Sequence, residues 1–244
     1  HVEDLDGHVL EAKIEDLGAG FGYTLPKDKF RQPYIARQVR VTIPIHLAPL
    51  SWASFQLVEG VAEHSDGIFQ NGVIDTPFVT LSVDEGITVY DKTTNEAYED
   101  FIQFEDRGDI GNEYIYFQPK GTEPIFAQLK GYEVLENNSR YAKVLLKHDL
   151  TIPVSADEKL DAEQRGIIEF MKRDAGRSEE LTTIPLETEM TVFVDNPQIR
   201  FKTRFTNTAK DHRIRLLVKT HNTRPSNDSE SIYEVVTRPN KPAA

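Results

Sequence analysis

Ile199-Arg200-Phe201-Lys202-Thr203-Arg204-Phe205 alternates apolar or small residues with basic ones over its whole length. Successive side chains of a β-strand point to opposite faces, so Phe201, Thr203 and Phe205 are expected to face a core and the basic residues to face solvent. The same period of two recurs along the chain, in Gln38–Ile43, Trp52–Val58, Phe78–Val83, Gly86–Tyr90, Tyr114–Phe117, Tyr141–Leu146, Met190–Val194, His212–Val218 and Ile232–Val236. The chain is therefore predicted to be built mainly of short strands.

Turn residues separate these strands and no helix alternates with them. Asn71-Gly72, Asp84-Glu85-Gly86, Asp195-Asn196-Pro197 and Arg238-Pro239 are residues that reverse a chain. Many short strands without interleaved helices favour β-sandwiches over a βαβ fold. The fold class is therefore predicted as all-β.

One segment departs from the strand pattern. Ser155-Ala156-Asp157-Glu158 begins like a capping box, and Leu160, Ile167, Ile168 and Met171 follow at roughly helical spacing. Gly166 inside the segment costs about 1 kcal/mol relative to Ala, which favours a short helix. We interpret it as a helical insertion between strands, either a loop over a binding face or a surface decoration.

Small and polar residues between Glu59 and Gly67 indicate a boundary. Residues 1–62 are predicted to form a small β-sandwich domain. Residues 63–244 are predicted to form a larger, incomplete one.

The composition excludes several classes of partner. A net charge of −12 argues against binding to nucleic acid or to an anionic membrane, because both need a Lys/Arg-rich surface. No apolar run approaches the ~20 residues that span a bilayer. The chain has no cysteine, for which a cytoplasmic setting is the plain interpretation, although many exported bacterial proteins also lack cysteine. It starts at His1 without a signal pattern, so we expect it to be part of a longer protein.

No familiar catalytic or metal-binding motif is present. The seven histidines form neither an HxH nor an HExxH arrangement, and no nucleophile elbow or phosphate-binding loop occurs. No metal ligands and no catalytic residues are therefore assigned.

The segment Phe104–Tyr116 is the most unusual stretch of the chain. It places Glu105, Asp106, Asp109 and Glu113 beside tyrosines and two glycines. Carboxylates accept hydrogen bonds from sugar hydroxyls, and Tyr rings cover the apolar faces of a pyranose. A calcium loop would share this composition, but the spacing is not that of an EF-hand. An acidic surface turn, or a carboxylate pair for glycoside hydrolysis, also remains open.

Three segments, taken in order, resemble bacterial α-mannosidases of glycoside hydrolase family 38. They are the run Phe104–Pro119 (FEDRGDIGNEYIYFQP), preceded by Gly86–Lys92; the run Asn207–Arg215, similar to the family's "N-x-A-x-D-H-R-L-R"; and Tyr233–Pro239, similar to its "F-x-V-V-x-R-P". The resemblance covers about residues 66–240, and the first 60 residues resemble the preceding small β-domain.

The resemblance implies a galactose-mutarotase-like β-supersandwich in an enzyme that also carries a catalytic zinc barrel and a helical bundle. No segment here resembles the zinc ligands or the nucleophile, so this chain is predicted to need no cofactor and to be inactive alone. It would be a non-catalytic β-domain of a retaining α-mannosidase that shapes the substrate cleft and packs on the barrel. A carbohydrate-binding module and a purely structural interdomain or oligomerisation sandwich are the alternatives.

The resemblance also implies site residues. Tyr114 is the best match to a tyrosine that touches the bound sugar in relatives, and Tyr116 is its alternative. Asp106, Asp109 and Glu113 are weaker candidates for contacts with sugar hydroxyls. Asn207, Asp211, His212 and Arg213 are interpreted as a buried turn network.

Overall fold

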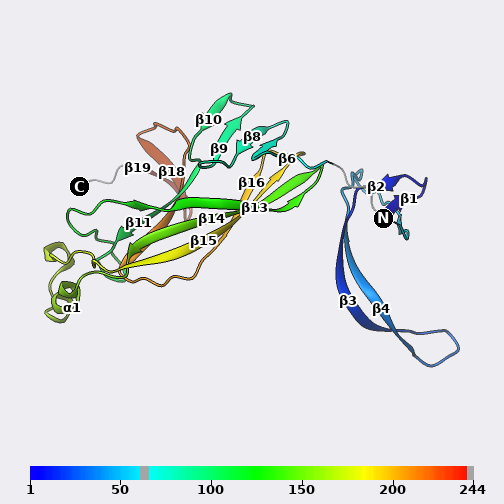
Figure 1. Cartoon of the computed structure of the whole chain (residues 1–244), viewed down its shortest axis with the longest axis horizontal. Coiled ribbons are helices and arrows are strands. Elements are labelled where there is room, and N and C mark those ends of the chain that lie inside the picture. The colour runs from blue at the N-terminus through cyan, green and yellow to red at the C-terminus, as the bar shows by residue number, and fades with distance from the viewer. Residues whose placement is uncertain (61–65, 241–244) are drawn as a thin grey trace. The chain divides into compact units, whose positions relative to one another are not determined.

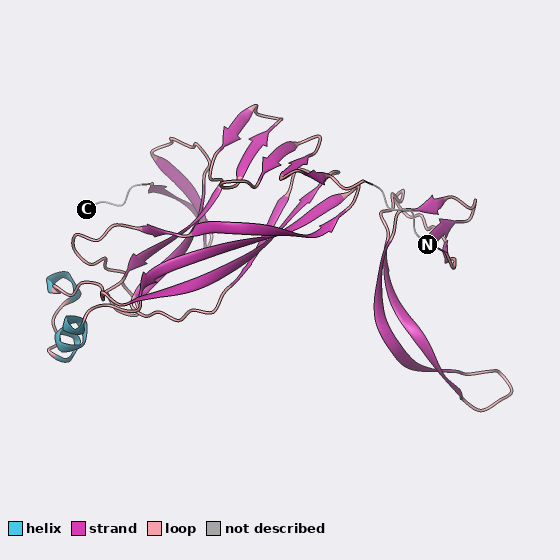
Figure 2. Cartoon of the chain, in the orientation of Figure 1, coloured by secondary structure: helices cyan, strands magenta, loops and turns pink. Residues whose placement is uncertain are grey.

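The computed structural model describes residues 1–60 and 66–240 and divides the chain into two compact units, His1–Asp66 and Gly67–Ala244. The predicted boundary between residues 62 and 63 lies outside the described residues. Strands are the main regular structure of both units, which confirms the all-β class (Figure 2). Within the described residues no helix is long and apolar enough to cross a membrane.

The first unit holds two small antiparallel sheets. Three strands pair in the order β2-β1-β5: β1 (Val2–Asp4), β2 (Val9–Leu10) and β5 (Phe55–Leu57). The hairpin of β3 (Lys13–Thr24) and β4 (Gln32–Thr42) extends away from that sheet (Figure 1). Val2 is the one fully buried apolar side chain among the described residues of this unit. Its core is therefore very small.

A long four-stranded sheet organises the second unit. Its strands, in spatial order, are β13 (Gln128–Asn137), β14 (Tyr141–Pro153), β15 (Leu181–Phe193) and β16 (Ile199–Arg204). Alternate residues of β14 and β15 are buried, as the period of two predicts. The stretch at Ile199 lies in β16, where Phe201 pairs with Met190 of β15.

Two smaller sheets cover the buried side of β14 and β15. The first is β10-β9-β8-β7-β6, with strands Glu96–Tyr98, Thr88–Asp91, Val79–Ser82, Val73–Asp75 and Phe69–Gln70. The second is β12-β11-β17, with strands Ile125–Phe126, Ile102–Gly108 and His212–Val218. Leu81 and Ile74 pack with Leu146 and Met190, and Phe104 packs with Leu150 and Leu186. The unit is thus a β-sandwich with two adjoining cores.

Four local predictions differ from the structure. Phe205, which was expected to face a core, follows the end of β16 and is exposed. Residues 114–117 lie in a loop and not in the predicted strand. The prediction was wrong because the aromatic residues at the tip of this loop alternate as they would in a strand. Ile232 and Tyr233 form the turn between β18 (Ser226–Ser231) and β19 (Glu234–Pro239), with Tyr233 at a φ of 64°. Arg238 and Pro239 consequently belong to β19. The turn at Asn71-Gly72 is confirmed, since both residues take the positive φ that a tight hairpin requires.

The helical insertion lies between β14 and β15, at the end of the long sheet (Figure 1). Helix α1 (Glu158–Arg165) begins after Asp157, whose side chain accepts a hydrogen bond from the Lys159 amide, and ends at Gly166. A short 3-10 helix follows at Phe170–Lys172. The predicted short helix is confirmed, but its N-cap is Asp157, and the capping box predicted from Ser155 to Glu158 does not form.

Candidate functional site

Residues 109–118 form a compact loop after β11, which we call the acid loop. Asp109 Oδ1 accepts hydrogen bonds from the amides of Gly111 at 2.9 Å and Phe117 at 3.1 Å. Asn112 Oδ1 accepts from the amides of Tyr114 and Ile115, both at 2.9 Å. These side chains replace the backbone hydrogen bonds that a paired strand would provide, and they hold the loop in a defined conformation.

The helical insertion braces this loop from one side. The buried Arg173 donates from Nη1 to the carbonyls of Ile110 at 2.5 Å and Gly111 at 2.6 Å. Phe117 packs edge-to-face on Phe170, with ring centroids 5.6 Å apart. Ile110 is buried with Ala156, Leu160 and Ala175 of the insertion in a small separate core. The insertion is therefore a structural support for the acid loop.

The tip of the acid loop carries an exposed tyrosine and an exposed carboxylate. Tyr114 is 89% exposed, although its backbone is held by Asn112. Glu113 beside it is exposed as well. A rigid aromatic ring next to a carboxylate can cover one face of a sugar and accept a hydroxyl hydrogen bond.

Tyr116 points to the other side of the acid loop. The guanidinium of Arg213 lies 3.5 Å from the centre of its ring, and its hydroxyl donates to Gln118 Oε1 at 3.3 Å. Burial raises the pKa of Tyr116, and the neighbouring Arg213 opposes that rise. Its ring is thus occupied by a cation–π contact within this chain.

Asp106 is fully buried beneath the acid loop. Its two carboxylate oxygens lie 2.6 Å from Arg177 Nη1 and 2.6 Å from His212 Nδ1, and Nε2 of His212 lies 3.0 Å from Asn207 Oδ1. Asp106 therefore contacts other side chains, and its placement does not support the predicted contact with sugar. Asp109 likewise serves the backbone of the loop.

Glu105 lies on the opposite face of β11 from Asp106. Arg107 Nε at 3.0 Å and Arg215 Nε at 2.9 Å donate to its carboxylate. Burial raises the pKa of Glu105, but the hydrogen bonds from the two arginines outweigh it and the pKa ends below its usual value. Glu105 is thus an ionised structural anchor between β11 and β17.

Comparison with known proteins points to one family. The family described as "Glycosyl hydrolases family 38 C-terminal domain 1" matches residues 1–59. A putative mannosylglycerate hydrolase of Halalkalibacterium halodurans is 34% identical over 94% of this chain and 27% of its own length. An alpha-mannosidase from Enterococcus faecalis V583 superposes with a TM-score of 0.81 at 36% identity, over 98% of this chain and 28% of that one. The chain matches the C-terminal region of family 38 glycosyl hydrolases.

A second Enterococcus faecalis structure, of a protein in glycosyl hydrolase family 38, matches with a TM-score of 0.79 at 32% identity, over 98% of this chain. The chain spans little more than a quarter of the length of these relatives. It therefore corresponds to one part of these longer proteins.

The residues of this family 38 region do not supply the zinc site that the family implies. Among the described residues, the one group of three His, Cys, Asp or Glu with adjoining ligand atoms is Asp4, Asp6 and His8. Asp4 already accepts from the amides of Asp6 and His8, and its other oxygen lies 2.9 Å from His8 Nδ1. These hydrogen bonds explain the cluster as a turn in the first unit.

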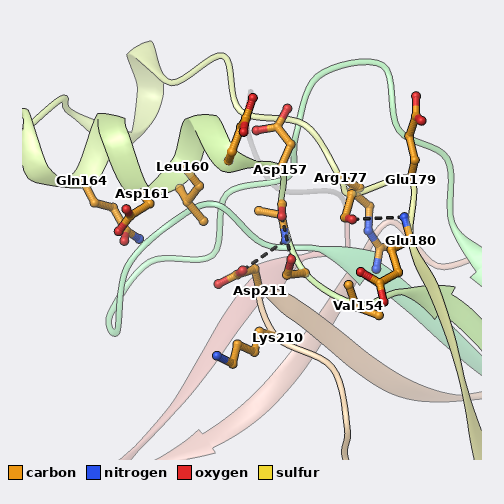
Figure 3. Close-up of a pocket in the computed structure, with 14 residues that line it drawn as sticks. Val154, Asp157, Leu160, Asp161, Gln164, Arg177, Glu179, Glu180, Lys210 and Asp211 are labelled. Carbon is orange, nitrogen blue, oxygen red and sulfur yellow. Dashed lines mark hydrogen bonds between the residues drawn. The ribbon is translucent and has the colours of Figure 1, made fainter.

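Sequence reasoning missed a cavity of about 890 Å³ beside the insertion of the family 38 region. Figure 3 shows Asp157 and Asp161 at its upper side and Asp211 and Lys210 at its lower side. Asp211 Oδ2 accepts from the amide of Ala156 at 3.1 Å, which ties the predicted turn network to the insertion. Arg173 and Arg177 were also missed, because basic residues in an insertion carry no signal of their distant partners.

Proposed function

We propose that this family 38 region is a non-catalytic β-domain of a retaining α-mannosidase that presents the acid loop to the substrate cleft of the whole enzyme. The observation that carries the proposal is the acid loop itself. Its backbone is held by Asp109, Asn112 and Arg173, yet Tyr114 at its tip is exposed. Side-chain hydrogen bonds fix the backbone of this loop while its tyrosine stays exposed, and such a loop suits a role in positioning a ligand.

The proposed substrate class is an α-mannoside. It rests on the printed names of the relatives, an alpha-mannosidase and a putative mannosylglycerate hydrolase, and on the likeness over nearly the whole chain. The remaining contacts of the region would be made with the catalytic barrel and helical bundle of the same polypeptide. Tyr114 would lie against the sugar and Glu113 would accept from a hydroxyl.

The test is Tyr114→Ala in the full-length enzyme, with Tyr233→Ala as a matched control. Tyr233 is also a tyrosine at a turn and is 102% exposed, but it lies in the β18–β19 hairpin. We expect kcat/KM of Tyr114→Ala to fall about tenfold, because a stacking contact of roughly 1.4 kcal/mol is lost. The melting temperature should stay unchanged, because the Tyr114 side chain is almost fully exposed and makes few packing contacts. Equal activity of the two variants would contradict the proposal.

The chain by itself provides a second test. We expect no release of product from an α-mannoside by the 244-residue chain with added Zn²⁺, because the catalytic domain is absent. Calorimetric titration with mannose and α-mannobiose should show no heat of binding beyond dilution. Binding by the isolated chain would favour a carbohydrate-binding module instead, and turnover would refute the non-catalytic role.

A further inference from the structure

The hairpin β3–β4, residues 13–42, is a long ribbon that we call the arm. Its two strands pair with each other from Lys13↔Thr42 to Thr24↔Gln32, and within the described residues they pair with no other strand. No residue of either strand is fully buried. An isolated two-stranded hairpin is marginally stable in water, so the arm is expected to gain its stability from a partner.

One face of the arm is apolar and uncovered. The register places Phe21 opposite Ile35 and Tyr23 opposite Pro33 on this face. Phe21 is 72% exposed and Ile35 is 77% exposed, and Phe30 in the loop at the tip is exposed too. Directly opposed apolar pairs would normally face a core. Here they form an unpartnered hydrophobic surface.

On the other face of the arm, two side chains lie over glycines of the paired strand. Gly20 and Gly22 lie opposite Ala36 and Tyr34, and they leave room for the side chains of Gln38 and Tyr34 to cross the ribbon. A Cβ atom at Gly22 would come within 2.7 Å of the Tyr34 ring. The two faces therefore differ: Phe21 and Ile35 are more exposed than Tyr34 on the other face, which is 48% exposed, so the Phe21–Ile35 face is the stronger candidate for a partner.

Charge identifies the kind of partner that fits. All six Lys and Arg residues of the first unit lie in the arm, against three Asp and Glu, so the arm carries a net charge of +3. Residues 67–244 carry 22 basic and 30 acidic residues, a net charge of −8. Two arms would repel each other, whereas the arm of one copy and the second unit of another attract.

We propose that the arm docks on the acidic second unit of another copy of this chain, so that two chains associate through reciprocal arm contacts. A reciprocal exchange buries the same surface twice and closes into a twofold dimer. This role is separate from the proposed function, because it concerns the first unit and needs neither the acid loop nor a sugar.

The test is the mass of the 244-residue chain in solution, by light scattering and sedimentation over a range of concentrations. We expect a species of twice the 27.8 kDa chain mass. Phe21→Ser with Ile35→Thr should weaken the dimer by at least about tenfold, because the apolar contact is lost. Both residues are exposed, so the fold of the second unit should be unaffected. Ile232→Ser with Tyr233→Ser is the matched control and should leave the dimer unchanged.

Salt and charge variants test the electrostatic part. Raising the ionic strength should weaken the dimer, and Lys27→Glu with Lys29→Glu should weaken it and reduce that salt dependence. Carbodiimide cross-linking of mixed isotope-labelled and unlabelled chains should join lysines of one arm to carboxylates of the second unit of the other copy. A monomer at every concentration, a dimer indifferent to the arm variants, or cross-links only within one copy would overturn the proposal.

Discussion

Single residues in the second unit show how polar groups are used to hold the sandwich together. Asp106 is buried with Arg177 and His212, and Glu105 is clamped by two arginines across β11 and β17. Removing one partner of such a buried pair leaves an uncompensated charge, which costs more than an exposed pair contributes. The acids that composition singles out are therefore divided between structural roles and exposure at the loop tip.

His148 provides a pH-dependent prediction. Its ring packs on Phe104 in the second core, and burial lowers its pKa from 6.5 to about 4. The unfolded chain takes up a proton below pH 6.5 while the folded chain does not, so stability is lost as the pH falls towards 4. We expect His148 to account for roughly 2 kcal/mol of the stability lost between about pH 7 and pH 5.

The measurement is urea unfolding of the wild type and of His148→Leu at both pH values. The variant should lose about 2 kcal/mol less than the wild type on acidification. His46→Leu is the control, because His46 is exposed and its removal should leave the slope unchanged. Identical pH dependence of wild type and His148→Leu would show that the ring is protonated without cost.

Elements far apart in the sequence cooperate around the acid loop. The loop follows β11, its brace comes from the insertion between β14 and β15, and Asp109 donates its amide to the carbonyl of Asp211 before β17 at 2.8 Å. The small core of Ile110, Leu160 and Ala175 is distinct from the two sandwich cores. The loop and insertion therefore form a local unit whose rigidity can change without unfolding the sandwich.

Arg173→Met tests that local unit. The substitution keeps the apolar stem and removes the donor to Ile110 and Gly111, leaving two carbonyls unpaired. We expect faster hydrogen exchange of the amides in residues 109–117, by about tenfold, with little change in the exchange of β14 and β15. Arg165→Met, which removes an exposed ion pair with Asp161, is the control and should have no such effect.

At the scale of the whole molecule, the two units differ in the size of their hydrophobic cores. The second unit has two sandwich cores, whereas Val2 is the single fully buried apolar residue described in the first. Hydrophobic burial is the main favourable term in folding, so the second unit carries most of the stability. The first unit, with its exposed arm, depends on contacts outside itself.

A truncation measures this difference. Residues 67–244 expressed alone should unfold cooperatively with a midpoint close to that of the full chain. Residues 1–66 alone should show weak or no cooperative unfolding, because a core of this size does not offset the conformational entropy of about 60 residues. Cooperative unfolding of the short fragment as a monomer would contradict this assignment of stability, and would also weaken the case for a docked arm.

The sequence by itself determined the all-β class, the presence of a short helix in the insertion and an acidic turn near Asp109, although residues 114–117 of the acid loop were predicted as a strand. Each of these depends on signals between near neighbours: a period of two, an N-cap, and glycine and acidic residues in a short run. The family likeness was readable for the same reason, because its motifs are continuous stretches.

Only the tertiary structure decided which acidic side chains are buried in ion pairs and which are exposed to solvent. Asp106 and Glu113 look equivalent in the sequence, but the first meets Arg177 of the insertion and His212 of β17, and the second stays at an exposed tip. The same holds for Phe21 and Phe201. Both lie in segments where apolar and other residues alternate, but Phe21 faces solvent and Phe201 packs against a core. Burial and ion pairing depend on contacts between residues far apart in the chain, and local patterns carry no record of them.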